Sequence, residues 1–274
     1  MSINAQDAAK LFEQAVAESG PAEIARYERL IALIDNAGSP DLQTLGAKAR
    51  LNKGIALAHQ GKFQDALTSF DDLNSAYADS AHPDVQALAA AAMVNRAFVL
   101  GMQQNILQAL AAYDEVVERF GAAAAVELQE QVAKALLNKA CTLARCNRTT
   151  EEYAVFTEIM RRFSDAVDNR LLVLVAKARH NRALALDKMG STAEADTLLE
   201  TIAEQFWQAE HSSLKEQVIH ALAQKASFQA RRGNRNEAND IYDRILKRYG
   251  DDPSPDLKEH LDRVRFNRGF SYHF

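Results

Sequence analysis

One position in this sequence recurs at an unchanging spacing of 43 residues. At each recurrence an amide residue is followed by a basic residue and then by Gly or Ala. The amides of this column are Asn52, Asn95, Asn138, Asn181, Gln224 and Asn267. A fixed period of this length is typical of a solenoid, in which one supersecondary unit is stacked many times. The period therefore constrains the architecture more strongly than the length of 274 residues, which alone would suggest about two domains.

Residues 84–126 show what one repeat contains. Apolar residues at helical spacing predict a first helix over 84–103 and a second helix over 106–120. Polar residues separate the two, and Gly121 follows the last apolar residue, as Gly often does at the end of a helix. The unit is predicted to be a helical hairpin, and the chain an all-α solenoid of antiparallel helix hairpins.

The period also divides the chain. We predict a single solenoid over residues 1–274 with about six and a half repeats. The first hairpin lacks the amide–basic–small triplet, as expected of a capping repeat, and the chain stops halfway through the last repeat. The predicted parts are a degenerate hairpin (1–40), five repeats (41–83, 84–126, 127–169, 170–212 and 213–255) and an unpaired C-terminal helix (256–274).

Two charged columns run in register along the repeats. The basic column follows the amides and comprises Lys53, Arg96, Lys139, Arg182, Lys225 and Arg268. The acidic column lies on the second helices and comprises Glu28, Asp71, Asp114, Glu200 and Asp243, with Thr157 interrupting it. We predict salt bridges between neighbouring repeats, each contributing about 0–1 kcal/mol where it is exposed.

Composition excludes several classes of protein. The net charge of −5 and the pI of about 5.8 argue against nucleic-acid binding. Two cysteines are too few for a disulfide framework, and no apolar run approaches the length of a membrane span. The N-terminal residues lack the basic and apolar regions of a signal peptide. We therefore expect a soluble protein of the cytoplasm.

The repeat resembles the tetratricopeptide repeat over nearly the whole chain. The resemblance rests on Asn, small residue and Leu in the first helix, Gly at the turn, and Ala and an aromatic residue in the second helix. Examples are Asn138, Ala140 and Leu143; Gly61, Gly190 and Gly233; and Ala109 with Tyr113 and Ala238 with Tyr242. The repeat is nine residues longer than the common pattern, and the aromatic residue early in the first helix is replaced. The resemblance implies a right-handed superhelix whose first helices line a concave groove, binding of a partner, and no catalysis.

One face of the first helices is the candidate binding surface. Its positions are four, seven and eleven residues after Lys48 and recur in every repeat. This first-helix stripe comprises Lys48, Asn52, Ile55 and His59; Ala91, Asn95, Phe98 and Met102; Lys134, Asn138, Cys141 and Arg145; Lys177, Asn181, Leu184 and Lys188; His220, Gln224, Ser227 and Arg231; and Arg263, Asn267 and Phe270. These positions hold no acidic residue, so the groove is expected to be basic and lined by amides.

Twelve residues of this stripe are the peptide-binding candidates: Lys48, Asn52, Asn95, Phe98, Lys134, Asn138, Arg145, Lys177, Asn181, Lys188, Gln224 and Arg231. A primary amide can both donate to and accept from the backbone of an extended peptide. The basic side chains favour an acidic partner or one with a free C-terminal carboxylate. Two structural alternatives stay open: the amides can join neighbouring helices, and the basic residues can form a solvated face.

The function expected from these patterns is a non-catalytic scaffold that binds a peptide or protein segment. The alternative is an oligomerisation or structural module, because the last helix is rich in aromatic residues and has no partner helix. Those aromatic residues are Phe266, Phe270, Tyr272 and Phe274. The seven histidines form no short-spaced ligand pair on one helical face, so we predict no metal site, no cofactor and no enzymatic activity.

Overall fold

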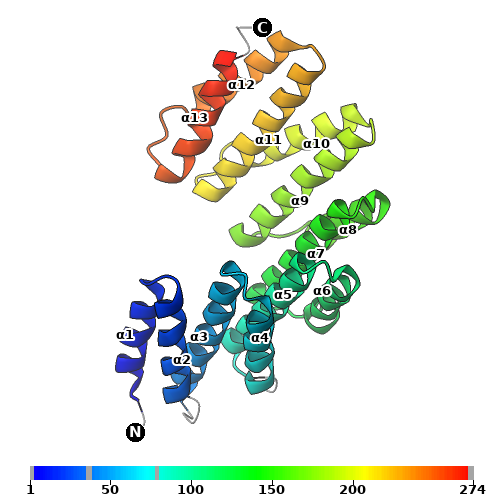
Figure 1. Cartoon of the computed structure of the whole chain (residues 1–274). Coiled ribbons are helices and arrows are strands. Elements are labelled where there is room, and N and C mark those ends of the chain that lie inside the picture. Colours follow the sequence, from blue (N-terminus) through cyan, green and yellow to red (C-terminus); the bar gives the residue numbers. More distant parts are fainter. Residues whose placement is uncertain (1–2, 35–38, 78–79, 271–274) are drawn as a thin grey trace. The chain divides into compact units, whose positions relative to one another are not determined.

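The computed structural model describes residues 3–34, 39–77 and 80–270, and within these ranges the chain forms thirteen helices (Figure 1). Their bounds are α1 Ala5–Val16, α2 Pro21–Ile34, α3 Pro40–His59, α4 Phe63–Tyr77, α5 Pro83–Met102, α6 Ile106–Phe120, α7 Val126–Arg145, α8 Thr149–Arg162, α9 Asn169–Lys188, α10 Thr192–Phe206, α11 Ser212–Arg231, α12 Arg235–Tyr249 and α13 Pro255–Phe270. The predicted all-α class is confirmed. The side chain of Phe270, together with Tyr272 and Phe274, lies outside the described part.

The helices group into two compact units, Met1–Cys146 with α1 to α7 and Asn147–Phe274 with α8 to α13. Within each unit, every helix packs against the next one in sequence. Each first helix also packs against the next first helix: α1, α3, α5 and α7 form one such row, and α9, α11 and α13 form the other. Among the described residues, second helices do not contact one another in this way. The first helices are therefore the closely spaced row of each unit.

The ends of the helices follow from local sequence. Pro stands at the first helical position of α3, α5 and α13, where its missing N–H costs nothing. At the turn inside each hairpin one residue has a positive φ, which is 73° at Gly61, 83° at Gly190 and 88° at Gly233. Gly20, between α1 and α2, has φ 76°, and the equivalent positions after α5 and α7 are Gln104, with φ 67°, and Asn147, with φ 56°. Only Gly adopts this left-handed conformation without steric cost, so Gln104 carries a penalty that the four glycines avoid.

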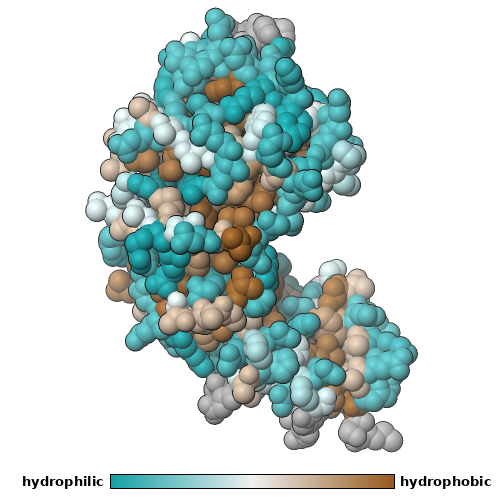
Figure 2. All heavy atoms as spheres, turned by 180° about the vertical axis from the view of Figure 1, so that it is seen from behind, coloured by the Kyte–Doolittle hydropathy of each residue, from teal (hydrophilic) through white to brown (hydrophobic). Residues whose placement is uncertain are grey.

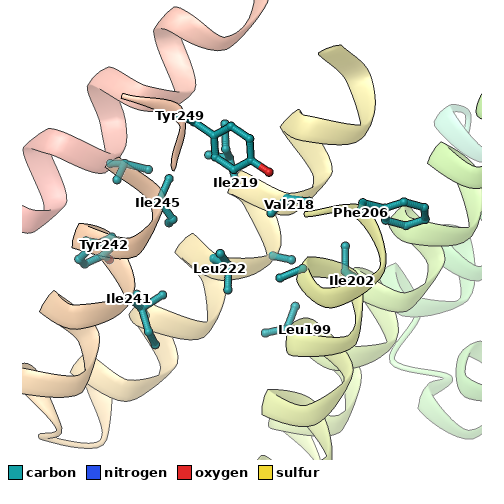
Figure 3. Packing of buried hydrophobic residues seen from close by; sticks show 14 of the residues in the cluster. Leu199, Ile202, Phe206, Val218, Ile219, Leu222, Ile241, Tyr242, Ile245 and Tyr249 are labelled. Atoms are coloured by element: carbon teal, nitrogen blue, oxygen red, sulfur yellow. The ribbon is translucent and has the colours of Figure 1, made fainter. Parts of the chain in front are cut away.

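The core of the second unit shows how the apolar columns pack (Figure 3). Leu199 and Ile202 of α10 face Val218 and Leu222 of α11, and Ile245 of α12 closes the layer from the other side. All five side chains are fully buried. Burial of each of these side chains contributes roughly 1.5–3 kcal/mol to the stability of the fold. The aromatic column is equally buried, because Tyr27, Phe70, Tyr113, Phe156 and Tyr242 are each no more than 3% exposed.

Five of the predicted salt bridges between neighbouring repeats are confirmed. The pairs are Lys53–Glu28 at 3.0 Å, Arg96–Asp71 at 2.7 Å, Lys139–Asp114 at 2.5 Å, Lys225–Glu200 at 2.8 Å and Arg268–Asp243 at 2.8 Å. Where Thr157 interrupts the acidic column, Arg182 instead hydrogen-bonds the hydroxyl of Tyr153 and lies 4.3 Å from the centre of its ring. The register between first and second helices is thus held by the same ion pair at five positions and by an Arg–Tyr contact at the sixth.

Helix α5 differs from the expectation that no segment is apolar enough to span a membrane. Its mean hydropathy over an 18-residue window is 1.4, so by length and composition it could cross a bilayer. However, 56% of that window is buried inside the protein, against the helices on either side. Burial of this extent is what the core helix of a compact unit shows.

Candidate functional site

The first-helix stripe lines a cavity in each unit. In the first unit Asn52, Ile55 and His59 of α3 line a cavity of about 380 Å³, together with Tyr27 of α2. In the second unit a cavity of about 330 Å³ lies among α9, α11 and α13. Its polar lining includes the stripe residues His220, Gln224, Ser227, Arg263 and Asn267. The stripe therefore coincides with hollowed surface at both places.

The amides of the stripe have partners within the protein at several positions. Asn52 Nδ2 donates to the hydroxyl of Tyr27 at 3.3 Å, and Asn267 hydrogen-bonds Tyr242 in the same way. Both tyrosines are buried, and burial raises their pKa. Asn95 faces a repeat with Phe instead of Tyr, and its Nδ2 donates to the carbonyl of Ala91 at 2.8 Å. The structural alternative for the amide column thus applies at these three positions.

The remaining amides are half-buried on the same row of helices. These are Asn138 on α7, Asn181 on α9 and Gln224 on α11. Gln224 lines the cavity of the second unit. The hydroxyl of Thr142 donates to the backbone carbonyl of Asn138 at 2.9 Å. Of these three amides, Gln224 is the one that lines the cavity of the second unit.

The basic character of the stripe is weaker than the sequence suggests, because acidic residues one turn away compensate part of it. Lys134 pairs with Glu130 at 2.7 Å, and Arg263 pairs with Glu259 at 3.0 Å. Arg231 pairs with Asp187 of α9 at 2.6 Å, in a network that also holds Arg232 and Asp196. The stripe positions hold no acid, but acidic residues beside them pair with three of its cations.

Four candidate basic residues remain exposed without an ion pair in the described part of the chain: Lys48, Arg145, Lys177 and Lys188. Lys188 lies close enough to Glu152 to lower its pKa, although burial of that carboxyl outweighs the effect and raises it. Among the candidate residues of the second unit, the exposed cations without an ion pair in the described part therefore lie on α9. An incoming carboxylate would find its cations there.

The stripe of α5 is apolar. Phe98 is 47% exposed and Met102 is 44% exposed, whereas most large apolar side chains of this helix are buried. Exposed hydrophobic residues between hydrophilic ones are also visible on the face that Figure 2 draws. Exposed aromatic and Met side chains are frequent at protein interfaces. The candidate surface of the first unit thus combines apolar contacts with amides.

The cavity of the second unit brings together side chains that are far apart in sequence. His220 of α11 and His260 of α13 face each other, with His220 Nε2 2.9 Å from His260 Nδ1. Glu216, one turn before His220, places its Oε1 3.9 Å from His220 Nδ1 and 3.7 Å from His260 Nε2. His180 of α9 lines the same cavity, and its Nε2 is buried without a hydrogen-bond partner among the described residues.

Electrostatics keep His180 and His220 neutral near pH 7. Burial lowers the pKa of His180 to about 4, and the neighbouring His220 adds to the effect. Burial also lowers the pKa of His220, followed by the proximity of His260, whereas Glu216 acts in the opposite direction. A neutral imidazole offers one N–H and one lone pair, so the facing nitrogens of His220 and His260 share a single proton.

Sequence reasoning missed this histidine group. Ligand pairs were sought at short spacing on one helix, but His180, His220 and His260 lie 40 residues apart on three successive first helices. A spacing close to the 43-residue period is the signal that could have revealed them, because such residues lie side by side in a solenoid.

Comparisons with known proteins agree with the repeat architecture. Residues 221–252 match the family model of the tetratricopeptide repeat. No curated protein matches the sequence significantly.

Among solved structures, the apo form of RapI is similar with a TM-score of 0.66 and 14% identity, over 98% of this chain and 69% of that one. A thermophilic tetratricopeptide protein of Thermus thermophilus, TTC0263, is similar with a TM-score of 0.42 and 14% identity, over 83% of this chain and 100% of that one. The tetratricopeptide domain of P58(IPK) is similar with a TM-score of 0.33 and 12% identity, over 95% of this chain and 65% of that one. The likeness to RapI is one of fold.

Proposed function

We propose that the chain is a repeat protein of the tetratricopeptide superfamily and a non-catalytic scaffold that binds a peptide or protein segment along its first-helix stripe; the match of residues 221–252 to that repeat and the likeness of fold to RapI support this. Proteins built from this repeat are generally protein-interaction scaffolds. The observation that carries the proposal is that the stripe lines a cavity in each unit. The proposal includes a cytoplasmic location, which the low cysteine content favours.

The two units offer different chemistry to a partner. In the first unit Phe98 and Met102 of α5 are exposed, and Ile55 of α3 lines the cavity. In the second unit Lys177 and Lys188 of α9 are exposed, and Lys177 lies near His220 of the cavity that Gln224 lines. A segment with apolar side chains fits the first surface, and an acidic segment or a C-terminal carboxylate fits the second.

A peptide-array screen followed by solution affinities tests the proposal. Peptides selected on the wild-type protein are measured again on Phe98→Ala and Lys177→Ala. The matched controls are Leu107→Ala, an exposed apolar residue of α6, and Lys247→Ala, an exposed cation of α12. We expect the first-helix substitutions to weaken binding by at least about 1 kcal/mol and the controls to leave it unchanged. The reverse pattern would place binding on the second helices.

The role of the carboxylate is tested separately with one peptide in two forms. A selected peptide with a free C-terminus is compared with its C-terminal amide on the wild type and on Lys177→Ala. If the terminal carboxylate contacts Lys177, amidation lowers the affinity of the peptide for the wild type and changes its affinity for Lys177→Ala only slightly. Equal losses in both proteins would show that Lys177 does not contact the terminus.

Self-association is the second candidate, because Phe266 of the last helix is 62% exposed. The packing of α13 involves α11 and α12 within the described residues. Light scattering across protein concentration, on the wild type and on Phe266→Ser, decides between the two. A concentration-dependent mass that Phe266→Ser abolishes supports self-association, and a constant monomer mass excludes it.

A further inference from the structure

The cavity of the second unit contains the chemistry of a metal site. Glu216, His220 and His260 each offer one ligand atom, and these atoms lie within 4.8 Å of one another. Within the part of the chain that the structure describes, this is the group with that property. We propose that Glu216, His220 and His260 bind a divalent transition-metal ion, with Zn²⁺ as the reference case. This inference is independent of peptide binding.

The two imidazoles are placed as a chelating pair. Their facing nitrogens are 2.9 Å apart, and the rings are nearly perpendicular at 82°. Two nitrogens that each bind one Zn²⁺ at about 2.0–2.1 Å in a tetrahedral site are about 3.3 Å apart, so the rings need to separate by only a few tenths of an ångström. The ion replaces the shared proton between His220 and His260, because each nitrogen must then present its lone pair to the metal. The second ring nitrogen of each histidine carries the proton in that state.

The carboxylate completes the set of protein ligands. Glu216 lies one helical turn before His220, so that α11 presents both side chains on one face. Its Oε1 lies 3.9 Å from His220 Nδ1 and 3.7 Å from His260 Nε2, so the carboxylate has to rotate to reach an ion at the facing nitrogens, where its charge would offset part of the positive charge. Two imidazoles and one carboxylate form a donor set that suits Zn²⁺, Ni²⁺ or Cu²⁺ better than Mg²⁺ or Ca²⁺, which prefer oxygen ligands.

The surroundings set the strength of the site. Lys177 and Arg263 lie near His220 and repel a cation, whereas Glu259 pairs with Arg263 and reduces that repulsion. The cavity of about 330 Å³ leaves room for water to complete the coordination. His180 lines the cavity as well. Three protein ligands with an open position are typical of sites that accept a further ligand.

Calorimetric titration of the full chain with ZnCl2 after treatment with a chelator tests the inference. We expect one equivalent of Zn²⁺ per chain and an increase in Tm on binding. Each of His220→Gln and His260→Gln is expected to weaken binding about tenfold or more, and Glu216→Gln to weaken it as well. The matched controls are His211→Gln and Glu237→Gln, two exposed residues of the same unit, which should bind as the wild type does.

Two outcomes overturn the inference whatever the stability of the variants. One is that the folded wild type binds no Zn²⁺, and the other is that the control variants lose binding to the same extent as the ligand variants. Circular dichroism of each variant verifies that its helices are intact. Co²⁺ provides a second measurement, because its visible absorption reports nitrogen and oxygen ligands directly. A Co²⁺ spectrum unchanged by His220→Gln and His260→Gln together would place the ion elsewhere.

Discussion

Arg96 of one first helix binds Asp71 of the preceding second helix at 2.7 Å, and the two residues are 25 positions apart in sequence. The same separation recurs in four other ion pairs. Arg96 and Asp71 are 35% and 55% exposed, so solvent screens their attraction. The main effect of the contact is therefore on the register of the two helices, that is, on which turn of one helix faces which turn of the next, and its contribution to the free energy of unfolding is small.

We expect Arg96→Met to lower the free energy of unfolding by less than about 1 kcal/mol. A double-mutant cycle with Asp71→Asn measures the coupling between the two residues by chemical denaturation. The same cycle on Lys225 and Glu200, which are 18% and 22% exposed, should give a larger coupling. A larger value for the Arg96 pair would contradict the role of solvent screening.

Glu200 predicts a dependence of stability on pH. Burial raises its pKa, but hydrogen bonds from Lys225 at 2.8 Å and Arg244 at 2.6 Å outweigh burial and lower it below 4.5. The stability that the ionised carboxylate provides is therefore present above pH 4.5 and is lost as the pH falls through the lowered pKa of the folded state.

Denaturation curves of the wild type and Glu200→Gln between neutral pH and acid check this. The difference in unfolding free energy between the two proteins should shrink as the solution is acidified. Glu237→Gln, on the exposed face of α12, serves as the control and should show no such convergence. A difference that stays constant with pH would show that Glu200 stabilises through packing alone.

Gly54 and Gly269 occupy the same column but predict opposite responses to Ala. A Cβ at Gly54 would lie 2.8 Å from Cδ1 of the buried Phe70, whereas a Cβ at Gly269 meets nothing within 4 Å. Overpacking costs about 1–3 kcal/mol, which exceeds the roughly 1 kcal/mol that Ala gains over Gly in a helix. We therefore expect Gly54→Ala to lower Tm and Gly269→Ala to raise it slightly. Thermal unfolding of both variants decides, and a gain in Tm for Gly54→Ala would contradict the packing argument.

The turn at Gln104 offers a stabilising change. Its φ of 67° costs a residue with a Cβ about 1–2 kcal/mol, and Gly61 shows the same turn with φ 73°. In both hairpins the N–H that follows binds a carbonyl five residues earlier, Lys62 to Leu57 at 2.9 Å and Asn105 to Leu100 at 3.0 Å. Gln104→Gly should raise the free energy of unfolding by about 0.5–1 kcal/mol.

The reverse change is the control for that prediction. Gly61→Gln places a Cβ in the same left-handed conformation and should destabilise the protein by about the amount that Gln104→Gly gains. Chemical denaturation of both variants provides the comparison. Two effects of the same sign would show that the turn conformation does not determine stability.

Much of the fold could be predicted because periodicity reports which residues face each other. The column of Asp71 and the column of Arg96 share one period, which is sufficient to pair them without knowing the helix geometry. Gln104 could not be recognised as a left-handed residue, since Gly and, less strongly, Asn and Asp are the residues that indicate that conformation in sequence. The division after Cys146 was also not visible, because the columns continue through it.

The candidate site was predicted less well, for a reason of geometry. The stripe is defined by positions on single helices, but side chains at other positions and on neighbouring helices extend far enough to pair with its residues. Glu130 therefore compensates Lys134 although it lies outside the stripe, and Asp187 reaches Arg231 from the preceding first helix. His220 and His260 meet for the same reason, since they occupy different columns that adjoin only when two first helices pack together.

Packing between sequence neighbours has a consequence for how the length of this protein can change. Within each unit, each helix packs against its neighbours in sequence and, in the first-helix row, against the next first helix. Removing one whole period from within a unit would join two surfaces that already carry matching columns, whereas removing any other number of residues would bring unlike columns together. The chain can therefore be shortened or extended in whole periods, and its stability should change in steps of one hairpin.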